Sequence, residues 1–131
     1  MNDEEMRAML IEYMGKGFLE NILAMMKQDP SLLRFLPALV GDDAIVVRLG
    51  ATALIEELVG ARCRALADAV PGLLELLGHG NPTIRGDAAN VLGIIGDPSA
   101  LGPLKDLSLD ANASVREIAR EAVQEIEEAQ K

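Results

Sequence analysis

Apolar residues recur at one helical spacing in three stretches of this chain. In each stretch they stand at i, i+4, i+7, i+8 and i+11, which places them on one face of an α-helix. The three sets are Val47, Ala51, Leu54, Ile55 and Leu58, then Ile84, Ala88, Val91, Leu92 and Ile95, then Val115, Ala119, Ala122, Val123 and Ile126. The pattern predicts three amphipathic helices, each with a buried apolar stripe.

Local signals mark where these and further helices begin and end. Asp29-Pro30, Asn81-Pro82 and Asp97-Pro98 are typical helix starts, because the Asx side chain caps free backbone N–H groups and proline fits the first helical position. Gly41, Gly60, Gly78 and Gly96 fall where helices should end. The sequence predicts helices over residues 3–14, 17–28, 31–40, 43–59, 62–77, 82–95, 98–108 and 113–129. No useful segment alternates with period two, so no sheet is expected.

The helices form a repeated unit. Residues 69–95 match residues 100–126 at a constant offset of 31, and Leu36-Pro37-Ala38-Leu39…Val47-Arg48 is a shorter version of the same pattern. A fixed period of this size is typical of stacked helical units that cannot bury their apolar faces alone. The connection before Pro71 is longer than its counterpart in the next repeat, so we expect a local irregularity there, such as a kink at Pro71.

Residues 81–97, which read Asn-Pro-Thr-Ile-Arg-Gly-Asp-Ala-Ala-Asn-Val-Leu-Gly-Ile-Ile-Gly-Asp, closely resemble a HEAT repeat. They resemble more narrowly the short prokaryotic form named after phycobilisome lyase subunits. Residues 112–119 carry the first half of that pattern and residues 42–48 carry it more loosely. The resemblance covers about residues 31–131 and implies an all-α fold, a short right-handed α-solenoid of three HEAT-like helix pairs with an N-terminal helical cap. It divides a single domain, residues 1–131, into a cap (1–28), repeat 1 (31–60), repeat 2 (61–96) and repeat 3 with the C-terminal cap (97–131).

The resemblance also implies a role for Arg48, Arg85 and Arg116. In the family, the arginine near the start of the second helix usually binds an acidic or carbonyl group in a neighbouring repeat. These three residues would then be structural ladder residues. The alternative is a row of arginines that holds an anionic ligand.

Charge and composition restrict the partners. Acidic residues outnumber basic ones by 21 to 12, a net charge of −9, and the chain has no Trp. Such a field repels phosphate backbones and anionic lipid, and few aromatic rings are present to stack on bases, so neither nucleic acid nor a membrane surface is an expected partner. The acidic start and the lack of a long apolar run favour a cytoplasmic protein.

Candidate chemistry is sparse. His79 is the only imidazole and lies in a predicted turn. Cys63 is the only thiol, and we expect it to be a small side chain buried in a helix. No metal-ligand set and no nucleophile with a base partner is visible, and the His-Glu pairs of HEAT-like metal oxygenases are absent. We therefore expect a non-enzymatic protein without a cofactor.

The outward positions of the second helices are the expected partner-binding surface, on the concave side where solenoids usually bind. These positions are Leu49, Ala53, Glu56, Gly86, Asn90, Gly93, Glu117, Glu121 and Gln124. The small middle set indicates either a shallow groove for a partner backbone or close packing against a neighbouring helix. The predicted function is a scaffold or adaptor that binds a protein partner; the alternative is an accessory or lyase-like protein that binds a small ligand or cofactor in the concavity.

The N-terminal helices are a second candidate surface. All six methionines lie within the first 26 residues, interspersed with Tyr13 and Phe18. Flexible, polarizable methionine packs in irregular cores and at partner surfaces alike. This segment is predicted to cap the first repeat, and a homodimer formed through the same Met-rich helices is the alternative.

Overall fold

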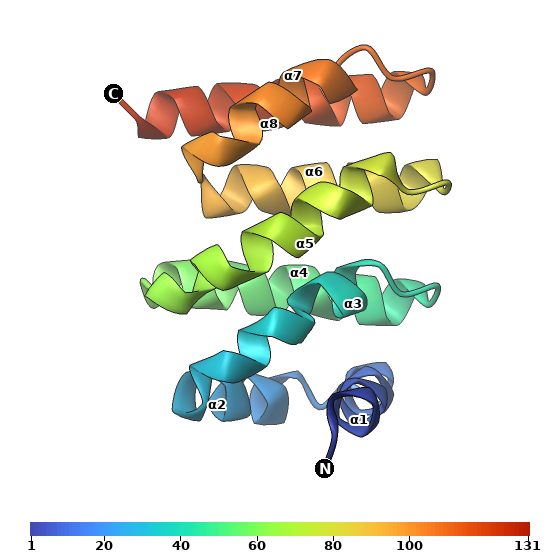
Figure 1. The fold of residues 1–131 in the computed structure, drawn as a ribbon, viewed down its shortest axis with the longest axis vertical. Helices are drawn as coiled ribbons and strands as arrows, with labels where there is room; N and C mark the ends of the chain where they lie inside the picture. The colour runs from blue at the N-terminus through green and yellow to red at the C-terminus, as the bar shows by residue number, and fades with distance from the viewer. The chain divides into compact units, whose positions relative to one another are not determined.

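Helical structure forms in every segment where the sequence predicts it, and no strand forms. The computed structural model describes all 131 residues, with eight α-helices and four 3₁₀-helices. The chain divides into two units, Met1–Ala69 (unit 1) and Val70–Lys131 (unit 2), drawn from blue to red in Figure 1. The predicted all-α fold is confirmed, whereas the division into a cap and three repeats stays a prediction.

Unit 1 contains four α-helices and two 3₁₀-helices: α1 (Asp3–Gly15), α2 (Leu19–Gln28), η1 (Pro30–Phe35), α3 (Leu36–Val40), α4 (Ile45–Gly60) and η2 (Arg64–Ala69). Figure 1 views α1 almost end-on while α2 and α4 lie across the view, so α1 runs across both. The apolar stripe of α4 is buried along its whole length. It packs against α1, α2 and α3, which supply Leu10, Met14, Ile22 and Leu39 to the core.

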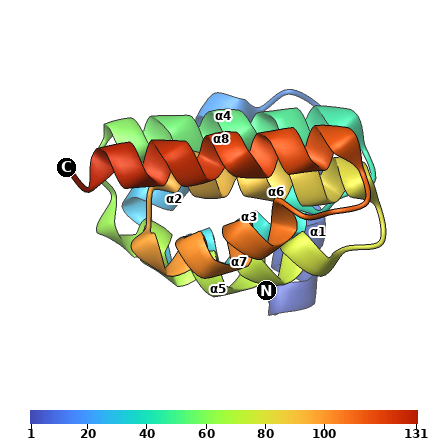
Figure 2. The ribbon, with the colours of Figure 1, turned by 90° about the horizontal axis from the view of Figure 1, so that it is seen from above.

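Unit 2 contains α5 (Val70–Glu75), η3 (Leu76–Gly78), α6 (Pro82–Ile95), η4 (Pro98–Ala100), α7 (Leu101–Leu107) and α8 (Ala113–Ala129). Seen from the front and from above, α6 and α8 lie side by side in one layer, and α5 and α7 form the other (Figures 1 and 2). The stripes of α6 and α8 are buried, except that Ile95 and Val123 are half-buried.

The first helix of each pair is interrupted where the sequence predicts one continuous helix. Residues 31–40 form η1 followed by α3, and residues 98–108 form η4 followed by α7. Pro37 stands at the second position of α3, where its missing N–H costs nothing; in a continuous α-helix its ring would clash with the carbonyl four residues earlier. The helix expected over 62–77 also changes from 3₁₀ to α, at Val70 directly before Pro71, so this change is common to the three pairs and the irregularity expected near Pro71 stays a prediction.

Candidate functional site

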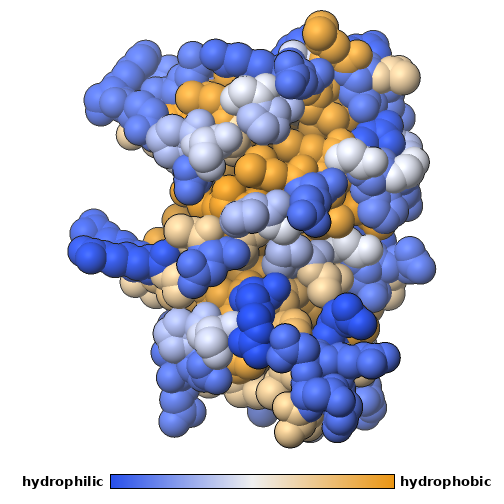
Figure 3. Space-filling model, in the orientation of Figure 1, coloured by the Kyte–Doolittle hydropathy of each residue, from blue (hydrophilic) through white to orange (hydrophobic).

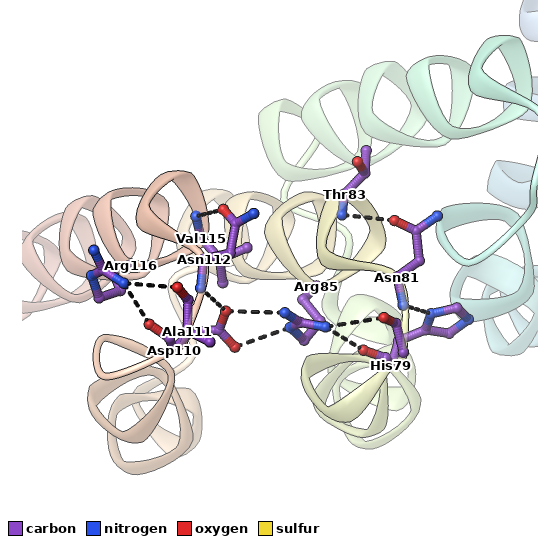
Figure 4. Close-up of polar contacts among 10 residues, drawn as sticks. His79, Asn81, Thr83, Arg85, Asp110, Ala111, Asn112, Val115 and Arg116 are labelled. Atoms are coloured by element: carbon purple, nitrogen blue, oxygen red, sulfur yellow. Dashed lines mark hydrogen bonds and ion pairs between the residues drawn. The ribbon is translucent and has the colours of Figure 1, made fainter.

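Each second helix begins after a turn that is closed by one acceptor side chain and one arginine. The side chains of Asp42, His79 and Asp110 each accept a hydrogen bond from the backbone N–H two residues later, at 2.9 Å. Six residues after each acceptor, an arginine donates through Nη1 to the carbonyl oxygen of that same acceptor residue, at 2.8 Å. The three turns are therefore equivalent, and Figure 4 shows the two that belong to unit 2.

Arg85 joins its own turn to the next one. Its Nε and Nη2 donate to the two carboxylate oxygens of Asp110, both at 3.0 Å, while Nη1 donates to the carbonyls of His79 and Gly80 (Figure 4). The two side chains are only 17% and 13% exposed. The hydrogen bond from Arg85, together with that from the Asn112 N–H, holds the pKa of Asp110 below its usual value. This is the bidentate geometry that arginine forms and lysine cannot reproduce.

The other two arginines donate hydrogen bonds to backbone carbonyls of the turns that precede their own helices. Arg48 is buried and donates to the carbonyls of Asp42 and Asp43. Arg116 donates to the carbonyls of Asp110 and Ala111. Each of the three predicted ladder residues thus donates hydrogen bonds to protein groups, which favours the structural role over a row of ligand-binding arginines.

Part of the expected partner-binding surface forms an apolar strip on α4. Leu49 is 64% exposed, and it lies beside Ile45, 64% exposed, and Val46, 49% exposed. Ala53 is half-buried and Glu56 is exposed on the same helix. We call Ile45, Val46 and Leu49 the α4 strip. Sequence reasoning identified Leu49 but missed Ile45 and Val46, although both are large apolar residues outside the predicted buried stripe.

The positions on α6 and α8 differ in exposure. Gly93 is buried, and a side chain there would lie 3.0 Å from the Cα of Ala122 on α8. Gly86 is also buried but lines a shallow depression of about 220 Å³ between the two helices, together with Asn90, Glu121 and others. Asn90, Glu117, Glu121 and Gln124 are exposed. Gly93 therefore permits close helix packing and offers no exposed surface to a partner.

Further depressions are open to solvent. One of about 470 Å³ is lined by four residues of α8 alone, Glu121, Gln124, Glu125 and Glu128, so it is an acidic surface and not an enclosed cavity. On the other layer of unit 2, Figure 3 shows apolar surface over α5 and α7 between hydrophilic side chains. Leu109, 82% exposed, lines a depression of about 360 Å³ there with Leu77 and Pro103.

No group of three or more His, Cys, Asp or Glu side chains is arranged to hold a metal ion. None of the helices combines the length and the apolar character needed to cross a membrane.

The helix pairs and their turn-closing arginines define an α-solenoid type of repeat protein, and comparison with known families agrees. The family model for HEAT repeats matches residues 32–124. The chain therefore belongs to the HEAT-repeat family. No curated protein matches its sequence. The narrower lyase-type subfamily stays a prediction.

Proposed function

We propose that this chain is a cytoplasmic, non-enzymatic protein-interaction module that binds a partner through the exposed faces of its second helices. The observation that carries the proposal is the α4 strip, where Ile45, Val46 and Leu49 remain exposed although the stripe on the opposite side of α4 is fully buried. Contiguous exposed apolar side chains mark interaction sites more often than chance placement does. HEAT repeats commonly serve as protein-interaction scaffolds, which supports the same conclusion.

The depressions favour a protein partner over a small ligand, because the two larger ones, of about 470 and 360 Å³, are open to solvent and the two between α6 and α8 are small. Those between α6 and α8 measure about 220 and 260 Å³. Ligand pockets usually measure about 300–1,000 Å³ and bury most of the ligand. The alternative of an accessory or lyase-like protein therefore has no specific feature of this structure in its favour.

The test is capture of a partner from an extract of the native host by the immobilised chain. We expect a protein retained by the wild type to be lost with Leu49→Asp and kept with Leu109→Asp, which places the same charge on the surface of unit 2. Equal melting temperatures of the two variants would show that both are folded. Retention of the same proteins by both variants would contradict a partner site on α4.

The N-terminal helices are proposed to cap unit 1 and not to form a dimer. Met14 and Met26 are buried in its core, and Met14 contacts α4 at Gly50. Met6 and Met9 are half-buried. We expect a monomer by sedimentation, unchanged by Met6→Asp; a dimer that this substitution dissociates would restore the alternative.

A further inference from the structure

We propose that the α4 strip binds a basic amphipathic helix of another protein, an inference that rests on the proposed function and names the partner's chemistry. Ile45 and Leu49 are one helical turn apart and Val46 lies beside them, so the three form one apolar face. Half-buried Ala53 extends this face by another turn. The face is about 12 Å long at 1.5 Å per residue, which suits two or three apolar anchors at i, i+3 and i+4 of a partner helix.

The exposed charges on α4 and its preceding turn favour a basic partner. Exposed Asp43 precedes the strip, and exposed Glu56 and Glu57 follow it on α4. The only basic residue of this helix, Arg48, is buried and donates to backbone carbonyls of the preceding turn. Every exposed charge on α4 and its preceding turn is therefore negative, in a chain whose net charge is −9. Lysine or arginine beside the apolar anchors of a partner would complement both ends of the strip.

The same charges disfavour a second copy of this chain as the occupant. A symmetric dimer would place the strip of one copy against the strip of the other. Whether the two α4 helices pair parallel or antiparallel, the acidic ends at Asp43, Glu56 and Glu57 would then face like charges, which is unfavourable. Nucleic acid and anionic lipid carry the same sign and are repelled as well.

A designed peptide pair provides the direct test. The probe is a fluorescent amphipathic peptide of about five helical turns, with leucine on one face and lysine on the other; its counterpart carries glutamate in place of lysine. We expect the full chain to bind the lysine peptide and not the glutamate peptide, measured by fluorescence anisotropy. Affinity should fall as the salt concentration rises from about 50 to 300 mM, because the attraction is partly between exposed charges.

The variants separate the strip from general attraction between opposite charges. Leu49→Asp adds a negative charge, so binding by charge alone would stay equal or become tighter; we expect at least a tenfold loss instead. Leu109→Asp makes the same change on unit 2 and should leave affinity within twofold of wild type. Glu56→Lys should weaken binding more than Glu127→Lys, which changes the net charge equally at an exposed position of α8.

Each contrary result overturns the proposal in a defined way. If Leu49→Asp binds the lysine peptide as tightly as the wild type does, the binding is non-specific attraction between charges. If Leu49→Asp and Leu109→Asp lose affinity equally, the α4 strip is not the binding site. A dimer in sedimentation that Leu49→Asp dissociates would make the strip a contact between copies. If the peptide fails to bind while extract capture still depends on Leu49, only the partner class is wrong; if both fail, the proposed function fails too.

Discussion

Gly93 lies where α6 and α8 approach each other closely, and this contact determines the expected effect of Gly93→Ala. In an exposed helix this substitution would stabilise by about 1 kcal/mol, because glycine loses more backbone entropy than alanine. In this structure the new Cβ would lie 3.0 Å from both Cα and Cβ of Ala122, and 3.1 Å from a carboxylate oxygen of Glu125. The Cα of Ala122 belongs to the backbone of α8, so α8 as a whole must move away from α6.

Forcing extra volume into a close contact costs about 1–3 kcal/mol. After the gain in helix propensity, Gly93→Ala should therefore destabilise the protein by about 1 kcal/mol, a fall in melting temperature of about 3–5 °C. Gly86→Ala is the matched control on the same helix. Its Cβ would approach only the Cδ1 of Ile118, at 3.1 Å. Ile118 is half-buried and can change rotamer, so this variant should be stabilised by about 0.5 kcal/mol.

Urea denaturation of the two variants and the wild type, followed by circular dichroism at 222 nm, measures both changes. The two substitutions should change the free energy of unfolding in opposite directions. If Gly93→Ala is as stable as Gly86→Ala, or more stable than the wild type, then α6 and α8 have room for a methyl group at this contact and the close approach does not restrict position 93.

The remaining predictions concern the turns and the N-terminal cap. The pKa of Asp110 is lowered in the folded protein, so its ionised carboxylate stabilises the fold at a pH above its unfolded pKa, and this stabilisation is lost as pH falls through the folded pKa. The wild type should therefore be more stable than Asp110→Asn by a constant amount near pH 7, and the difference should shrink below about pH 4. Urea denaturation of both proteins across this pH range measures the difference. Gly50→Ala would overlap only the Cε end of the buried Met14 side chain, so repacking of Met14 should offset the gain of about 1 kcal/mol in helix propensity; the substitution should therefore raise the melting temperature more in the Met14→Leu background than in the wild type. His79→Leu removes the acceptor for the Asn81 N–H and should destabilise by about 1 kcal/mol in urea denaturation, whereas His79→Asp, which restores the side chain of the equivalent turns, should be at least as stable as the wild type.

Helix ends could be predicted where a side chain makes the cap. Asn81 and Asp97 accept hydrogen bonds from the N–H groups of Thr83 and Ser99, as expected from the Asx-Pro pairs, and Gly96 adopts the left-handed conformation that ends α6. α4 ends at Gly60 as expected, although Gly60 itself is helical and the left-handed residue that follows the helix is Arg62. The 3₁₀ segments were not predicted, since the apolar period records which face is buried and not whether a turn has three residues or 3.6.

The surface was harder to predict than the core. On α4, apolar residues occur on nearly all sides, so the sequence alone did not show that Ile45 and Val46 would remain exposed while Val47 is buried. For Gly93 the sequence left two interpretations open, a groove or close packing. The choice depends on the distance between α6 and α8, which is a tertiary property that no local pattern contains.

Arg85, Leu49 and Ile45 have roles opposite to those that their residue types suggest. Arg85 has the charge and geometry of an anion-binding residue, yet it donates to Asp110 and to backbone carbonyls. Replacing Arg85 should therefore lower the stability of the fold and have little direct effect on partner binding. Leu49 and Ile45 have the character of core residues, yet they are mostly exposed, so replacing them with a polar residue should change binding and leave stability nearly unaffected. A scan of this family for function should therefore begin with the apolar residues that stand outside the buried stripe.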